Sequence, residues 1–209
     1  MTMDPTPLIH VIDDDESIRK AVTRLLKAAG YEVQSYTTSG EFLLAEQESR
    51  VGCIILDIRM PGPTGLELQA ALKRQGNSLP IIFLTGHGDI PMSVRAMKAG
   101  AVDFLTKPVQ KQELLAAVSQ ALEIQRQALA QQNRTQKIQE NYDLLTGRER
   151  TIFEMILRGK LNKQIASTLG IAERTVKAHR AQLMEKMQVD SLAELVRSAS
   201  FLRIDTDVS

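Results

Sequence analysis

The chain has no tryptophan and only one cysteine among its 209 residues. A single cysteine excludes a disulfide within the chain, and Cys53 lies in an apolar run where a small buried side chain is expected. No run of about 18 apolar residues occurs, so the pattern of a membrane-spanning helix is missing and no membrane partner is expected. The first residues lack a basic start followed by an apolar stretch, so we expect a cytoplasmic protein.

The chain also has little net charge. Its formal net charge of +1 favours neither nucleic acid nor a membrane surface as a partner. The charge is unevenly distributed, however, because residues 158–186 contain seven Lys and Arg residues against two Asp and Glu residues. This basic block is a weak indication of nucleic-acid binding, and it is equally compatible with a solvated helix face.

Short apolar runs alternate with helical patterns over residues 8–108. Several of the runs are continuously apolar, as is typical of strands covered on both faces. Five successive β–α units predict an α/β domain with a doubly wound, five-stranded parallel sheet of the flavodoxin type. The expected strands are 8–12, 32–36, 51–56, 80–84 and 102–105.

The chain after residue 143 shows no strand pattern and predicts an all-α domain of four short helices. Thr146 is placed to cap the first of them, with Glu149 at the spacing of a capping box. The expected helices are 147–157, 161–169, 173–187 and 191–202. The predicted domains are 6–122 and 142–204, joined by a polar, glutamine-rich linker at 123–141 that we expect to be helical.

Polar side chains follow four of the expected strands of the sheet. Asp13 and Asp14 follow the first strand, Asp57 the third, Thr85 the fourth and Lys107 the fifth. Because the carboxyl ends of parallel strands meet at one edge, these groups should gather there. Clustered carboxylates repel one another unless a cation joins them, and Mg²⁺ prefers such oxygen ligands. The sequence therefore predicts a magnesium site beside a place for a phosphoryl group.

Individual roles follow from the chemistry of these groups. We expect Asp14 and Asp57 to bind Mg²⁺ directly, Asp13 to act through water, and the Arg59 carbonyl to supply a third oxygen. With its charge shielded, Asp57 can attack phosphorus and form an acyl phosphate. Lys107, which precedes Pro108 and could be aimed by a cis peptide, would neutralise one phosphoryl oxygen, while the Thr85 hydroxyl would donate to another.

An enzyme of another kind is disfavoured by one residue. A phosphatase with an aspartate nucleophile would need a second acid two residues after Asp57, and Arg59 stands there. His87 lies two residues after Thr85. Arg59 and His87 either steer water beside the phosphoryl group or are simply exposed to solvent.

Residues 161–187 have the pattern of a helix-turn-helix. One helix stops at Gly170 and a second begins near Glu173, as expected for two helices joined by a short turn with glycine. The residues spaced to pack this pair together are Ile165, Leu169, Val176 and Leu183. The polar residues off that face give the second helix a cationic side suited to the DNA major groove; they are Lys163, Thr175, Lys177, Arg180 and Gln182.

Residues 6–122 resemble the receiver domain of two-component response regulators, a CheY-like fold. The motifs that carry the resemblance are Asp13-Asp14, Asp57, Met60-Pro61-Gly62, Thr85 and Lys107-Pro108, and the stretch from Thr85 to Leu105 resembles the FixJ-type branch. The resemblance implies phosphorylation of Asp57 by a sensor histidine kinase. It also implies a switch in which Thr85 turns toward the phosphoryl group and Phe104 turns inward.

In the FixJ-type branch the face that responds to this switch forms a homodimer after phosphorylation. The resemblance places Val94, Arg95 and Lys98 at that interface. From the residues alone, an ordinary amphipathic helix surface explains the same three positions.

The stretch from Leu145 to Val196 resembles the LuxR-type output domain of the NarL/FixJ family. Asn162-Lys163-Gln164-Ile165-Ala166 and Thr175-Val176-Lys177-Ala178-His179-Arg180 carry the resemblance most strongly. The sequence departs from the family pattern at Leu161, Gln188 and Leu192, where Ser, Gly and Arg are usual. Of these, Gln188 puts the turn before the last helix in doubt.

The resemblance also implies roles on the DNA. Lys177, Ala178 and Ala181 would face base edges, with Lys177 donating to guanine. Phosphate contacts would come from Lys163, Thr175, His179 and Arg180, although His179 could instead bond between helices. Leu192, Leu195, Val196 and Ala199 form an apolar stripe, expected to be half core and half dimer contact.

These observations predict a phosphorylation-controlled transcription factor, most simply an activator. Its expected partners are a sensor histidine kinase, promoter DNA, RNA polymerase and a second copy of itself. The alternative is signalling by protein–protein docking of the C-terminal helices without specific DNA binding. The cationic side of 173–187 argues against that alternative.

Overall fold

The computed structural model describes residues 6–45, 51–86 and 90–202. The chain divides into two compact units, Met1–Leu129 and Ala130–Ser209, and this division falls within the predicted linker. Residues 123–141 belong to a helix, α5, that runs over Lys111–Asp143. Within the described residues, no helix is long and apolar enough to cross a membrane.

The N-terminal unit is a doubly wound parallel sheet of five strands, as predicted. The strand order is β2-β1-β3-β4-β5, and every neighbouring pair is parallel. The connections reverse direction between β1 and β3, which is the switch point where open α/β sheets bind ligands. The strands are β1 (Leu8–Ile12), β2 (Glu32–Tyr36), β3 (Gly52–Asp57), β4 (Ile81–Thr85) and β5 (Asp103–Thr106).

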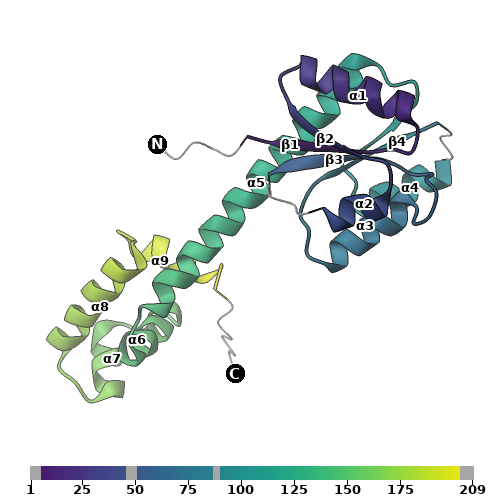
Figure 1. Cartoon of the computed structure of the whole chain (residues 1–209). Helices are drawn as coiled ribbons and strands as arrows, with labels where there is room; N and C mark the ends of the chain where they lie inside the picture. Colours follow the sequence, from purple (N-terminus) through teal and green to yellow (C-terminus); the bar gives the residue numbers. More distant parts are fainter. Residues whose placement is uncertain (1–5, 46–50, 87–89, 203–209) are drawn as a thin grey trace. The chain divides into compact units, whose positions relative to one another are not determined.

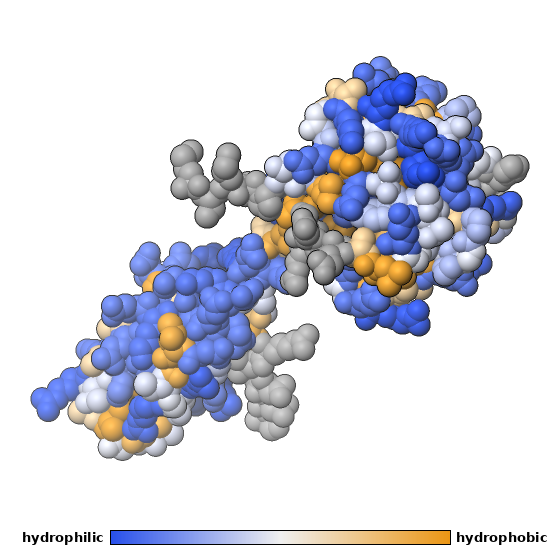
Figure 2. Space-filling view, in the orientation of Figure 1, coloured by the Kyte–Doolittle hydropathy of each residue, from blue (hydrophilic) through white to orange (hydrophobic). Residues whose placement is uncertain are grey.

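Helices cover both faces of this sheet (Figure 1). Besides α5, they are α1 (Glu16–Ala28), α2 (Ser39–Leu44), α3 (Gly65–Arg74) and α4 (Ile90–Lys98). Side chains of α1 and α5 form one core with the sheet, and those of α2, α3 and α4 form a second core on the other face. The visible surface is mainly hydrophilic, with apolar patches among the hydrophilic areas (Figure 2).

Three predicted strands begin and end one residue too early. Val51, Pro80 and Val102 each take part in a sheet-like hydrogen bond but lie just before β3, β4 and β5. At the other end, Asp57 and Thr85 are the last residues of β3 and β4 rather than the first residues after them. Their backbones are therefore held by ladder pairing, with Asp57 opposite Leu84 and Thr85 opposite Thr106.

The C-terminal unit contains the four predicted helices: α6 (Gly147–Leu157), α7 (Asn162–Leu169), α8 (Glu173–Met187) and α9 (Leu192–Ala199). Thr146 and Glu149 form the expected capping box at the start of α6. The last helix is shorter than predicted, because Ser191 caps its start and Ser200 its end. The four predicted core residues lie in one cluster, with Ile165, Val176 and Leu183 fully buried and Leu169 partly buried.

The turn before α9 forms despite its unusual residue. Gln188 ends α8 in the left-handed conformation, at φ 54° and ψ 47°, and among the described residues it is the one non-glycine with positive φ. Its N–H donates to the Glu185 carbonyl, so the helix end is satisfied in the ordinary way. The departure from glycine costs backbone strain and leaves the fold unchanged.

We expect Gln188→Gly to raise the free energy of unfolding of the C-terminal unit by about 0.5–1 kcal/mol. The left-handed strain of about 1–2 kcal/mol that it removes exceeds the extra chain entropy of glycine. The same change at Gln182, in the middle of α8, should instead lower the free energy by about 1 kcal/mol. Calorimetric unfolding of both variants would measure the two effects, and equal destabilisation would contradict the prediction.

Candidate functional site

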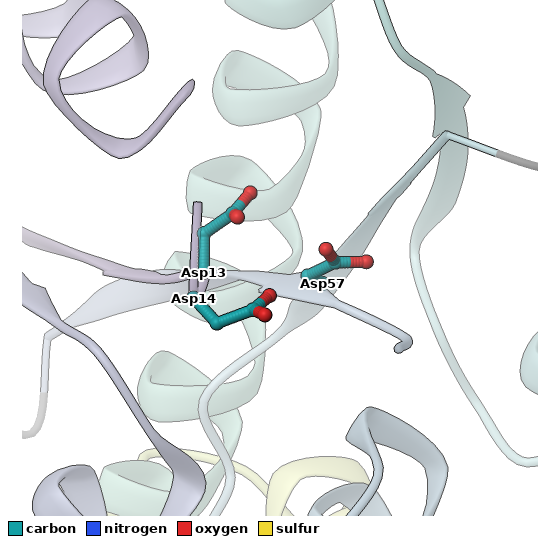
Figure 3. A group of neighbouring side chains, drawn as sticks. All are labelled: Asp13, Asp14 and Asp57. Carbon is teal, nitrogen blue, oxygen red and sulfur yellow. The ribbon is translucent and has the colours of Figure 1, made fainter. Parts of the chain in front are cut away.

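Three carboxylates meet at the carboxyl edge of the sheet (Figure 3). Asp13 and Asp14 follow β1, and Asp57 ends the neighbouring strand β3. Each offers an oxygen to a set whose members all lie within 4.8 Å of one another. Asp13 and Asp57 are buried, whereas Asp14 is exposed. The sheet thus joins residues that are more than forty positions apart in the sequence.

Lys107 ties two of these carboxylates together. Its Nζ lies 2.7 Å from Asp13 Oδ2 and 2.6 Å from Asp57 Oδ2. The peptide between Lys107 and Pro108 is cis, as the sequence suggested. The Lys107 N–H donates to the Thr85 carbonyl at 2.7 Å, which joins this loop to the end of β4.

Burial and pairing pull on the pKa values in opposite directions. Burial raises the pKa of Asp13 despite the lowering influence of Lys107. Burial by itself would lower the pKa of Lys107, but its hydrogen bonds to Asp13 and Asp57 outweigh that influence and raise it. The lysine is therefore firmly charged, while the more deeply buried Asp13 carries its charge at a cost.

The charges at this site do not balance. Three carboxylates against one ammonium leave two negative charges, and Asp14 makes no ion pair within the described part of the chain. A divalent cation would supply the missing charge, and oxygen donors at this spacing suit Mg²⁺. The donor set therefore fits the predicted metal.

The backbone around Asp57 is also constrained. The Arg59 N–H donates to Asp57 Oδ1 at 3.2 Å, while the Arg59 side chain is exposed. Gly65, the first residue of α3, packs so closely that a Cβ there would collide with the Asp57 carbonyl. The turn-rich stretch between β3 and α3 thus returns against the strand end and helps to hold Asp57.

The predicted switch residues lie on the neighbouring strands. Thr85 is 1% exposed at the end of β4, and Phe104 is half-buried on β5, opposite Phe83 and against the α2–α4 core. On α4, Val94 is 45% exposed, and Arg95 and Lys98 are exposed. The predicted position of His87 lies outside the described residues.

The polar side of α8 presents the residues predicted to contact DNA. Lys177, Ala178, Ala181 and Gln182 are exposed, as is Lys163 on α7. The other three predicted contacts are half-buried: Thr175, His179 and Arg180. Arg180 donates to Asn162 Oδ1 at 3.0 Å, which braces α8 against α7.

A partly buried ion pair joins α8 to α6. Lys186 of α8 lies 2.7 Å from Glu149 of α6, a residue that is only 2% exposed. Burial raises the pKa of Glu149, but its bonds to Lys186 and Thr146 outweigh that influence and lower it. On α9, Leu195 is buried, whereas Leu192 and Val196 are about half exposed, so half of the predicted stripe lies in the core.

One contact of the acidic site was not indicated by any sequence motif. Arg19 of α1 donates from Nη1 to the carbonyls of Asp13, at 2.8 Å, and Asp14, at 3.4 Å. The sequence indicates only that Arg19 lies one helical turn after Asp15. Asp15 caps α1 by accepting from the N–H groups of Ser17 and Ile18. That position places a side chain beside the loop without revealing which atoms it bonds.

The sequence matches two family models. Residues 9–119 match the response regulator receiver domain, and residues 143–199 match the luxR family of bacterial regulatory proteins. The response regulator protein TodT of Pseudomonas putida is 44% identical over 200 residues, which cover 96% of this chain and 88% of TodT. The transcriptional regulatory protein FixJ of Azorhizobium caulinodans is 42% identical over 191 residues, covering 91% and 90%.

Solved structures give the same result for the fold. The response regulator StyR is similar with a TM-score of 0.85 and 44% sequence identity, over 94% of this chain and all of that chain.

Asp14→Asn should stabilise the protein when no divalent metal is present. The change removes one of three mutually repelling charges, worth about 0.5–1 kcal/mol for charges a few ångströms apart near water. In Mg²⁺ the wild-type protein should instead be more stable than the variant, because the variant lacks one metal ligand. Thermal unfolding in EDTA and in Mg²⁺ would measure both effects. Asp15→Asn, which keeps a good helix cap, should change neither.

Proposed function

This chain belongs to the response regulators that join a receiver domain to a LuxR-type DNA-binding domain, and from that premise we propose that Asp57 is its phosphoacceptor. The domains are those of a transcriptional regulator of a two-component system and not those of an enzyme. The observation that carries the proposal is the Lys107 ammonium held between Asp13 and Asp57 beside a third carboxylate.

The chemistry follows from these positions. A carboxylate oxygen of Asp57 attacks the phosphorus of a phosphohistidine on a sensor kinase. The phosphorus–nitrogen bond breaks, the histidine leaves, and an acyl phosphate forms on Asp57. The Lys107 ammonium then forms an ion pair with one phosphoryl oxygen. The Thr85 hydroxyl turns toward the phosphoryl group and donates to another of its oxygens.

Receiver domains bind Mg²⁺ at an acidic pocket, and the described pocket has the charge to hold it. We assign Asp14 and Asp57 as direct ligands, Asp13 as a ligand through water, and the Arg59 carbonyl as a further oxygen. When bound, the ion supplies positive charge that offsets the negative charge gathered by the carboxylates and the phosphoryl group.

Phosphorylation and dimerisation are typical of this family. In this chain, Thr85 and Phe104 would carry the switch from the acidic site to the face of α4 and β5. The exposed Val94, Arg95 and Lys98 would then contact a second copy. Two joined copies double the number of DNA phosphates that are contacted, which steepens both affinity and salt dependence.

On DNA, the exposed side of α8 would enter the major groove. Lys177 would donate to a guanine edge, and the methyl groups of Ala178 and Ala181 would contact thymine. The remaining polar contacts would hold phosphates and set the register; they come from Lys163, Thr175, His179, Arg180 and Gln182. RNA polymerase is the expected final partner at the promoter.

Asp57→Asn should abolish labelling of the protein by acetyl phosphate. The amide cannot act as the nucleophile, and the change leaves the size of the side chain nearly unaltered. Asp103→Asn, at the opposite end of the sheet, should label normally. Mass spectrometry of the intact protein measures the phosphate, and stoichiometric labelling of the Asp57 variant would refute the assignment.

Lys177→Ala should weaken binding to a specific promoter site by about 1–3 kcal/mol and relax the base preference at one position. Lys163→Ala should weaken binding to specific and non-specific DNA alike, because a phosphate contact carries no sequence information. Gel shifts on both kinds of DNA separate the two. An unchanged footprint and affinity for Lys177→Ala would remove it from base recognition.

A further inference from the structure

We propose that Arg19 is a positioning residue for the acidic site, because its guanidinium holds the backbone turn that aims Asp13 and Asp14 at one metal ion. The inference deepens the proposed function and rests on its magnesium site. Within the described part of the chain, no hydrogen bond or ion pair joins Arg19 to the carboxylates of Asp13, Asp14 or Asp57. Its contacts are with the main chain of the two residues that supply the carboxylates.

One nitrogen of Arg19 donates to two successive carbonyls, closely to the first and more loosely to the second. Nη1 of Arg19 lies 2.8 Å from the Asp13 carbonyl oxygen and 3.4 Å from the Asp14 carbonyl oxygen. Arg19 is half-buried, and its own N–H donates to the Asp15 carbonyl at 2.9 Å in the first turn of α1. The side chain therefore projects from a rigid helix back onto the loop that precedes that helix.

The loop needs such a constraint because of how strands point their side chains. Successive side chains of an extended strand lie on opposite faces, so neighbouring residues cannot both face one point. β1 ends at Ile12, and both Asp13 and Asp14 bring a carboxylate oxygen near Asp57. The chain must leave the extended conformation between them. In an extended strand, successive carbonyls point in opposite directions. The Asp13 and Asp14 carbonyls accept from one Arg19 nitrogen, so the chain is not extended there.

Charge repulsion makes the constraint more important. Lys107 attracts Asp13 and Asp57, but Asp14 makes no ion pair within the described residues. Without metal, repulsion from the other two carboxylates opposes the close approach of Asp14 to them. The remaining bonds hold the backbone of Asp13, through the Tyr36 carbonyl, and of Asp15, through Asp13 Oδ1. The bond to the Asp14 carbonyl comes from Arg19.

Lysine is not equivalent to arginine in this role, because the guanidinium plane fixes the directions of the two N–H bonds of Nη1. The guanidinium is a planar group whose donors have fixed directions, whereas an ammonium is a point charge on a flexible stem. Arg19→Lys keeps the positive charge near the site but loses the planar donor group. This difference separates positioning from simple electrostatic attraction.

The test measures Mg²⁺ affinity by calorimetric titration of the unphosphorylated full-length protein. Arg19→Gln should raise the dissociation constant about 10–100-fold, the usual effect of removing a group that orients metal ligands. Arg19→Lys should lose most of that affinity too. Labelling by acetyl phosphate should need correspondingly more Mg²⁺, yet reach nearly the wild-type rate at saturating Mg²⁺. Arg24→Gln, on the same cleft beside α1, is the matched control and should bind Mg²⁺ normally.

Several results would overturn the inference. Normal Mg²⁺ affinity in Arg19→Gln would contradict positioning. It would do so even if the variant unfolded at a lower temperature in EDTA, because Arg19 would then only stabilise the fold. Full affinity in Arg19→Lys would reduce the role to charge alone and would also refute positioning. If the wild-type protein itself shows no Mg²⁺ binding, the proposed magnesium site fails together with this inference. If the wild-type protein binds Mg²⁺ and the Arg19 variants bind it equally well, only this inference fails and the proposed function stands.

Discussion

A single ammonium shared by two carboxylates organises the acidic site. Lys107 contacts Asp13 and Asp57, which come from neighbouring strands, and it reaches them from a loop after a third strand. Paired in this way, the two buried carboxylates are held close together before any metal or phosphate arrives. The single positive charge of this lysine cannot neutralise all three carboxylates. That deficit favours a cation at the site and leaves the carboxylates repelling one another.

The DNA-binding domain separates its stability from its function by helix face. Apolar residues of α6, α7, α8 and α9 close one core, and the Glu149–Lys186 pair braces α6 against α8. Of the cations predicted to meet DNA, Lys163 and Lys177 are exposed and lie outside that core, whereas Arg180 is half-buried and bonds to α7. Substitutions at Lys163 and Lys177 can therefore change recognition while the domain stays folded.

Periodicity and strand-end chemistry predicted much of the architecture. The five strands and four C-terminal helices lie within three residues of their predicted bounds, and the three aspartates and Lys107 meet at the sheet edge. The features that the sequence did not predict are those that leave no periodic pattern along the chain. The Arg19 contacts are to carbonyl oxygens, which every residue has, so sequence cannot single them out. Gln188 adopts a glycine conformation between Met187 and Val189, which both pack in the C-terminal core.

The sequence by itself determined the types of element, the core faces and the set of groups available for phosphoryl chemistry, because these depend on residue identity and spacing along the chain. The tertiary structure decided which of those groups touch. Strand register places Asp57 and Thr85 inside the ladder, and the three loops at the sheet edge bring Lys107 to Asp13 and Asp57 but not to Asp14. Distances between groups that are far apart in sequence depend on how the whole sheet pairs and twists, and no local pattern contains that information.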